Sequence, residues 1–108
     1  MKETFLKAEV FNMANMIDYS VGGVVSRQVL KSEAGNITLF SFDEGQGLSE
    51  HTAPFDAFVQ ILDGEAEVKI DSKPLKLTVG QSVIMPANVP HALHAVKQFK
   101  MLLTMIKS

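Results

Sequence analysis

Three histidines, His51, His91 and His94, are the residues of this chain best suited to chemistry. A neutral imidazole can ligate a metal ion, or accept a proton close to physiological pH. His91 and His94 are three residues apart, so on a regular strand they point to opposite faces and at most one of them faces an interior. No Ser-His-Asp arrangement, glycine-rich phosphate loop or spaced pair of carboxylates is recognisable beside them. The chemical question therefore reduces to the histidines.

Short strands must position these histidines. Turn-forming residues recur about every ten residues, which predicts an antiparallel sandwich or barrel. The clearest strand is residues 65–71, where Ala66, Val68 and Ile70 fall on one face and charged residues fall on the other. Residues 75–79 alternate in the same way, so the two segments predict a hairpin with one buried and one solvated face.

Two other segments, residues 58–62 and 99–106, carry apolar residues on both faces. A turn at Asp63-Gly64 is expected to separate the first of them from the strand that follows. A strand that is apolar on both faces needs cover on its outer side as well. In so small a chain, we expect a second copy to supply that cover.

The N-terminal segment has a different pattern. Residues 10–17 carry apolar side chains at helix-like spacing, which fits either one or two turns of amphipathic helix or an irregular arm. The expected division is an N-terminal arm at residues 1–22 and a single barrel domain at residues 23–108.

Composition narrows the class of protein. The chain has 108 residues, of which 46% are hydrophobic and 20% charged, so it has the material for one domain with a real core. A net charge of -2, scattered along the chain, argues against a nucleic-acid partner. Without cysteine there is no disulfide or thiolate site. The first residues show no signal-peptide pattern and no apolar run approaches the roughly 18 residues of a membrane span, so we expect a cytoplasmic protein with no membrane partner.

The spacing around two of the histidines resembles the paired motifs of the cupin superfamily. In the family's first motif a glycine and five further residues precede a His-x-His pair. In the second motif a glycine and five further residues precede a proline, and the histidine of the site follows that proline. The two motifs here span nearly half the chain in the right order. The matching residues are Gly45, His51 and Gly64 in the first motif and Gly80, Pro86 and His91 in the second. The resemblance implies an all-β, double-stranded antiparallel β-barrel of the jelly-roll type, usually a homodimer.

The chain departs from the family's motifs at the metal site. The family's usual site has four ligands, and His51 and His91 match the first and the last of them. Ala53 stands at the place of the second histidine and Ala57 at the place of the glutamate. Methyl groups donate no electron pair, and catalytic sites generally keep about three protein ligands. Asn88 stands at the place of the second motif's glycine. Asparagine, like glycine, tolerates a positive φ.

These residues predict a small organic ligand bound in the barrel pocket without a complete metal site. His51 and His91 both lie where a strand is expected to begin, at the rim of the barrel, where side chains can line a mouth. We expect His51, His91, Ser49, Ala53 and Ala57 to line it. The expected cofactor is none, or a divalent transition metal held weakly by His51 and His91.

Other functions stay open from the sequence. The chain can be a metal-dependent cupin enzyme of the oxygenase or isomerase type with a reduced His51/His91 site, or a metal-free enzyme with one histidine as general base. It can also be a purely structural or regulatory homodimer whose pocket is vestigial. Asp56 and Glu50 are one position away from inward-facing sites, so we expect both carboxylates to point away from the histidines.

Overall fold

The chain forms an all-β protein in the computed structural model, which describes residues 5–107. The antiparallel jelly-roll class predicted from the sequence is confirmed. No helix in residues 5–107 is long and apolar enough to cross a bilayer. Parts of the predicted arm and barrel domain, residues 1–4 and 108, lie outside the described range. The elements in chain order are a 3-10 turn η1 (Met13–Met16), β1 (Val24–Ser32), β2 (Gly35–Phe42), β3 (Gly47–His51), β4 (Asp56–Ile70), β5 (Lys73–Thr78), β6 (Ser82–Met85), β7 (His91–His94) and β8 (Phe99–Ile106).

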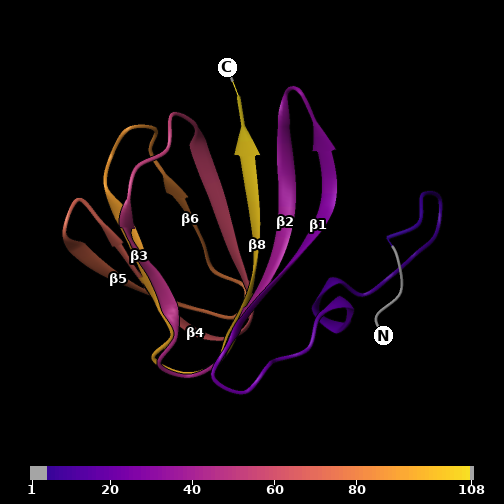
Figure 1. The fold of residues 1–108 in the computed structure, drawn as a ribbon, viewed down its shortest axis with the longest axis horizontal. Helices are drawn as coiled ribbons and strands as arrows, with labels where there is room; N and C mark the ends of the chain where they lie inside the picture. The colour runs from indigo at the N-terminus through magenta and orange to yellow at the C-terminus, as the bar shows by residue number, and fades with distance from the viewer. Residues whose placement is uncertain (1–4, 108) are drawn as a thin grey trace.

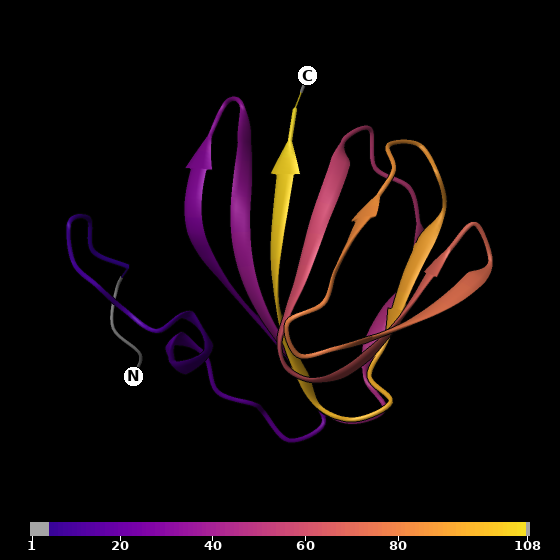
Figure 2. The same cartoon turned by 180° about the vertical axis from the view of Figure 1, so that it is seen from behind.

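The strands form two antiparallel sheets that share β4 (Figure 1). The first sheet has the order β1-β2-β8-β4-β6. The second sheet has the order β3-β7-β4-β5, and it contains the predicted hairpin, now β4 and β5. The sheets meet at one end, where β4 bends, and diverge toward the other, as Figures 1 and 2 show from opposite sides.

A glycine lets β4 pass from one sheet to the other without a break. Gly64 has a φ of +76°, and the register with β8 shifts between Ile61 and Asp63. A Cβ atom at Gly64 would lie 1.8 Å from the backbone oxygen of Gln98, so only glycine fits this crossing. The turn expected at Asp63-Gly64 is therefore wrong. These residues form a bend inside one strand of 15 residues, because Gly64 meets a distant segment of the chain.

The core lies between the two sheets. Phe42 of β2 and Phe99 of β8 are fully buried and stack with ring centroids 4.5 Å apart. Ala66 and Val68, predicted to face inward, are buried in the same cluster. Burial of these side chains fixes which face of each strand points inward, and with it the direction of every site residue.

The N-terminal arm packs on the outer face of the first sheet. It is irregular except for the single 3-10 turn η1, so of the two predicted forms the arm is the better description. Met16 and Ile17 are buried against Leu39, and Leu62 and Leu102 pack on the same cluster. At these positions the cover expected from a second copy is supplied by the chain itself.

Polar side chains hold the arm in place. Three side chains of the first sheet donate hydrogen bonds to alternate backbone carbonyls of the arm. The pairs are Lys100 Nζ to Ala14 (2.7 Å), Arg27 Nη1 to Met16 (2.5 Å) and Ser41 Oγ to Asp18 (2.8 Å). The hydroxyl of Tyr19 also donates to the carboxylate of Asp63, and burial together with this contact raises the pKa of Tyr19.

Replacing Gly64 by alanine should destabilise the fold by on the order of 3 kcal/mol or more, because the new Cβ collides with a backbone atom. Gly45→Ala is the matched control. Gly45 also has a positive φ, +83°, but nothing lies within 4 Å of the position that a Cβ atom would take there, so it should cost only about 1–2 kcal/mol. Denaturant unfolding measures both. Equal losses would contradict the close crossing at Gly64.

Candidate functional site

The structure brings His51 and His91 together at the open end of the barrel. The two residues are paired in register between β3 and β7. Their Nε2 atoms are 3.1 Å apart, and the ring centroids are 4.4 Å apart with an angle of 69° between the planes. Residues 40 positions apart in the chain therefore share one contact.

The ends of two adjacent strands position the pair. β7 begins at His91, as predicted, but β3 ends at His51, so the expectation that a strand begins there is wrong. The strand starts earlier, at Gly47, directly after the turn at Gly45. On its other side His91 is paired with Ile70 of β4, and the backbone N–H of Asp71 donates to the carbonyl of Pro90 at 2.8 Å.

A backbone carbonyl orients each ring. Nδ1 of His51 lies 2.7 Å from the carbonyl oxygen of Ser49, and Nδ1 of His91 lies 3.2 Å from that of Val89. A carbonyl oxygen only accepts hydrogen bonds, so each Nδ1 must carry the proton of its contact. In two neutral rings both Nε2 atoms are then left as acceptors, and they face each other. The pair has three contacts that each need a proton, and two neutral imidazoles carry only two protons.

The two histidines differ in exposure. His91 is 5% exposed, whereas His51 is exposed. Burial lowers the pKa of His91 below its ordinary value of 6.5, and the charge of His51 lowers it further, while the contact with the Val89 carbonyl opposes the shift. The buried ring is therefore the one that stays neutral.

The other predicted lining residues, Ser49, Ala53 and Ala57, offer no imidazole or carboxylate to a metal ion. Ala57 is buried in the core, and Ala53 is partly buried. Ser49 is exposed and contacts His51 through its backbone oxygen.

The remaining polar candidates point elsewhere. Glu50 and His94 are exposed, and the carboxylate of Asp56 accepts a hydrogen bond from the backbone of Ala87 at 2.9 Å.

The donor set can be tested against the metal that the cupin resemblance implies. Two nitrogens about 3 Å apart can both lie about 2.1 Å from one ion, so the pair alone has suitable spacing. Among residues 5–107, however, no group of three or more His, Cys, Asp or Glu side chains could hold a metal. The described residues thus do not form a metal site of the ordinary kind.

Two loops frame the pair. The backbone N–H of Asn88 donates to the carbonyl of Ala53 at 2.8 Å, which ties the loop before β7 to the loop after β3. Asn88 has a φ of 63°, the left-handed conformation that the motif's glycine would adopt freely. Cavities of about 360 and 370 Å³ lie on other surfaces, lined by neither histidine. The core behind the pair is packed.

Comparison with known families gives the same result as the motifs. Residues 38–107 match the family model described as Cupin domain. The chain belongs to the cupin family. No curated protein matches this cupin.

Solved structures extend the comparison. The cupin is similar to a conserved protein of unknown function from Streptococcus pyogenes, with 36% identity over 99% of this chain and 94% of that one and a TM-score of 0.92. It is similar to a cupin superfamily protein from Desulfitobacterium hafniense, with 27% identity over 100% and 99% of the two chains and a TM-score of 0.91. A cupin 2 conserved barrel domain protein from Leptotrichia buccalis is 40% identical over 90% of this chain, with a TM-score of 0.87, but the match covers only 47% of that chain.

Low pH should destabilise this cupin through His91. The unfolded chain binds a proton at this histidine near pH 6.5, while the folded state, with its lowered pKa, does not. The unfolded state therefore binds more protons in this range, and stability falls as the pH drops below about 6.5. Urea unfolding between about pH 6.5 and 5 should show a smaller loss for His91→Gln than for the wild type. His94→Gln, at an exposed position, should keep the wild-type dependence, and identical behaviour of the two variants would contradict the assignment.

Proposed function

We propose that this cupin binds a small organic acid beside the His51–His91 pair, without a complete metal site. The observation that carries the proposal is the 3.1 Å contact between two Nε2 atoms whose rings already use Nδ1 on backbone carbonyls. Such a pair lacks one proton, so it favours a state with one positive charge.

The extra proton has a defined place. Carried by His51, it lets Nε2–H of His51 donate to Nε2 of His91, while both Nδ1–H groups donate to their carbonyls. His91 is the acceptor because burial lowers its pKa. The positive charge then lies on the exposed ring at the mouth.

An anionic ligand suits this charge. No carboxylate joins the two histidines in a cluster of three among residues 5–107, and Asp56 is engaged with the backbone of Ala87. A carboxylate from a bound molecule would balance the charge on His51 and favour the protonated pair. The apolar part of the ligand would lie along Ala53 and the loops that frame the mouth. Because the core behind His91 is filled, the ligand is placed at the opening and not deep in the barrel.

A panel of small carboxylates, each paired with its neutral amide, tests this function. At least one carboxylate should raise the melting temperature saturably while its amide does not. Calorimetry should show tighter binding near pH 6 than near pH 8, with uptake of up to one proton. His51→Gln and His91→Gln should each weaken binding about tenfold or more, a loss of about 1.4 kcal/mol.

His94→Gln is the matched control for these variants, since His94 lies on the same strand as His91 but is exposed on the outer face. It should bind like the wild type. Equal binding of acids and amides, or full affinity in both His51→Gln and His91→Gln, would contradict the proposal.

The spacing of the two Nε2 atoms also favours a second candidate, a metal-dependent cupin enzyme of the oxygenase or isomerase type. A divalent transition ion could take the place of the missing proton, with water or substrate as further ligands. Elemental analysis of protein purified without an affinity tag decides between the two. A cupin that binds organic acids without a complete metal site should carry less than stoichiometric metal. Near-stoichiometric metal that is lost in both His51→Ala and His91→Ala would contradict the metal-free proposal and favour the second candidate.

A further inference from the structure

A carboxylate on β4 holds the loop that leads to His91. Oδ1 of Asp56 accepts a hydrogen bond from the backbone N–H of Ala87 at 2.9 Å, although the two residues are 31 positions apart. Asp56 begins β4 and pairs with Ile106 of β8, so its carboxylate is attached to the first sheet. His91 begins β7 in the second sheet. Residues 86–90, which we call the crossing loop, connect β6 of the first sheet to β7 of the second.

Three backbone amides fix the crossing loop, which begins and ends with a proline that has no N–H group. One of them donates to a side chain, one to the segment before β4 and one within the loop itself. The contacts are Ala87 to the carboxylate of Asp56 (2.9 Å), Asn88 to the carbonyl of Ala53 (2.8 Å) and Val89 to the carbonyl of Pro86 (3.4 Å). Every N–H group of the loop is therefore committed, and two of the three contacts lead to residues 53–56.

The crossing loop brings a carbonyl to His91. The carbonyl oxygen of Val89 lies 3.2 Å from Nδ1 of His91, and Val89 is only two residues from the amide that Asp56 holds. Because a carbonyl only accepts, it keeps the ring proton on Nδ1, and Nε2 is then an acceptor that faces His51 at 3.1 Å. The corresponding contact of His51 with the Ser49 carbonyl is shorter, at 2.7 Å. The contact of His91 is thus at the long end of the ordinary hydrogen-bond range, where a small outward movement of the loop would remove it.

We propose that Asp56 is a positioning residue of the histidine pair. Its carboxylate fixes the crossing loop, and the loop fixes the carbonyl of Val89. That carbonyl selects the tautomer of His91 whose Nε2 accepts from His51. Asp56 therefore acts on the pair through the loop. Its consequence for ligand binding rests on the proposed function, whereas the choice of tautomer depends on no ligand.

Asp56 has the chemistry for this role. A carboxylate only accepts hydrogen bonds, and its bond to an N–H group is stronger than that of a neutral acceptor. The side chain is exposed, so its charge stays solvated and no burial opposes it. The next residue, Ala57, is buried on the opposite face of β4. Ala57 therefore packs in the core while Asp56 is free to hold the loop.

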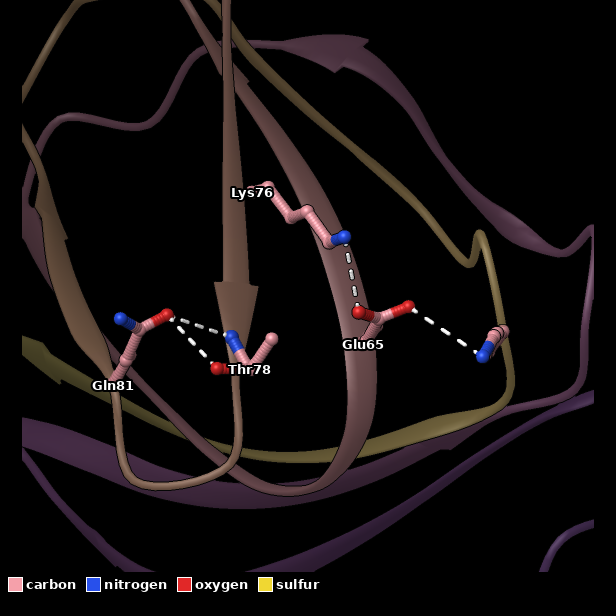
Figure 3. Close-up of polar contacts among 5 residues, drawn as sticks. Glu65, Lys76, Thr78 and Gln81 are labelled. Atoms are coloured by element: carbon pink, nitrogen blue, oxygen red, sulfur yellow. Dashed lines mark hydrogen bonds and ion pairs between the residues drawn. The ribbon is translucent and has the colours of Figure 1, made fainter.

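Gln81 makes a comparable contact that does not lead to the histidines. Its Oε1 accepts from the backbone N–H of Thr78 at 2.9 Å and from the hydroxyl of the same residue at 3.2 Å, as Figure 3 shows. Gln81 and Thr78 flank the turn between β5 and β6. Gln81 is exposed, like Asp56, and holds a backbone amide at the same distance. Truncation of either side chain removes a hydrogen bond to one amide, but only that of Asp56 releases the crossing loop.

Nitrogen NMR of the histidine rings in the metal-free full chain tests the proposal without a ligand. Near pH 6, the ratio of Nδ1–H to Nε2–H forms of neutral His91 should fall about threefold or more in Asp56→Ala, as expected when a hydrogen bond of ordinary net strength is lost. Asp56→Asn should keep most of the wild-type ratio, because its amide oxygen can still accept from Ala87. Gln81→Ala is the matched control and should keep the wild-type ratio. Thermal melting should show that all three variants are folded.

Amide hydrogen exchange gives a second measurement, which begins with the wild type. The Ala87 amide should be protected, and this protection should be lost in Asp56→Ala but kept in Gln81→Ala. An unprotected Ala87 amide in the wild type would overturn the proposal whether or not Asp56→Ala folds. A wild-type His91 ratio in folded Asp56→Ala, or an equal change in Gln81→Ala, would overturn it too. Failure of every carboxylate to bind would contradict the proposed function alone, because neither measurement here uses a ligand.

Discussion

The site depends on a shortage of one proton between two imidazoles. Backbone carbonyls at positions 49 and 89 commit both Nδ1 atoms of His51 and His91, and the register of β3 and β7 brings the two Nε2 atoms together. Carbonyls can only accept, so the third contact needs a proton or a cation from outside the neutral pair. The alanines at positions 53 and 57 remove the donors that would favour a metal ion. A proton on the exposed ring of His51 can then supply the third contact without a metal ion.

The contact between His51 and His91 depends on parts of the fold that are remote from both residues in the sequence. β4 belongs to both sheets, and Gly64 allows it to cross β8 closely enough for the sheets to share one core. The stacked rings of Phe42 and Phe99 belong to that apolar core, and the two imidazoles lie at the strand ends. A small barrel whose core is filled can offer chemistry only at its open end and on its outer faces.

Much of this was predictable from the sequence, for local reasons. Strict alternation indicated the inward face of residues 65–71, and the motif spacing placed His51 and His91 together. The positive φ of Asn88 agrees with its place in the second motif, where the family has a glycine. What could not be predicted depends on contacts between distant segments. Gly64 resembles a turn residue unless its approach to Gln98 is known. The carbonyls that orient the rings are backbone groups. Every residue has one, so no residue type in the sequence indicates which carbonyl contacts a histidine.

Nitrogen NMR of the histidine rings in uniformly labelled, metal-free protein tests the central claim most directly. Near pH 6, just below the ordinary imidazole pKa, His91 should be neutral with its proton on Nδ1, while His51 should be protonated on both nitrogens. A proton on Nε2 of neutral His91, or a doubly protonated His91 beside a neutral His51, would contradict the account.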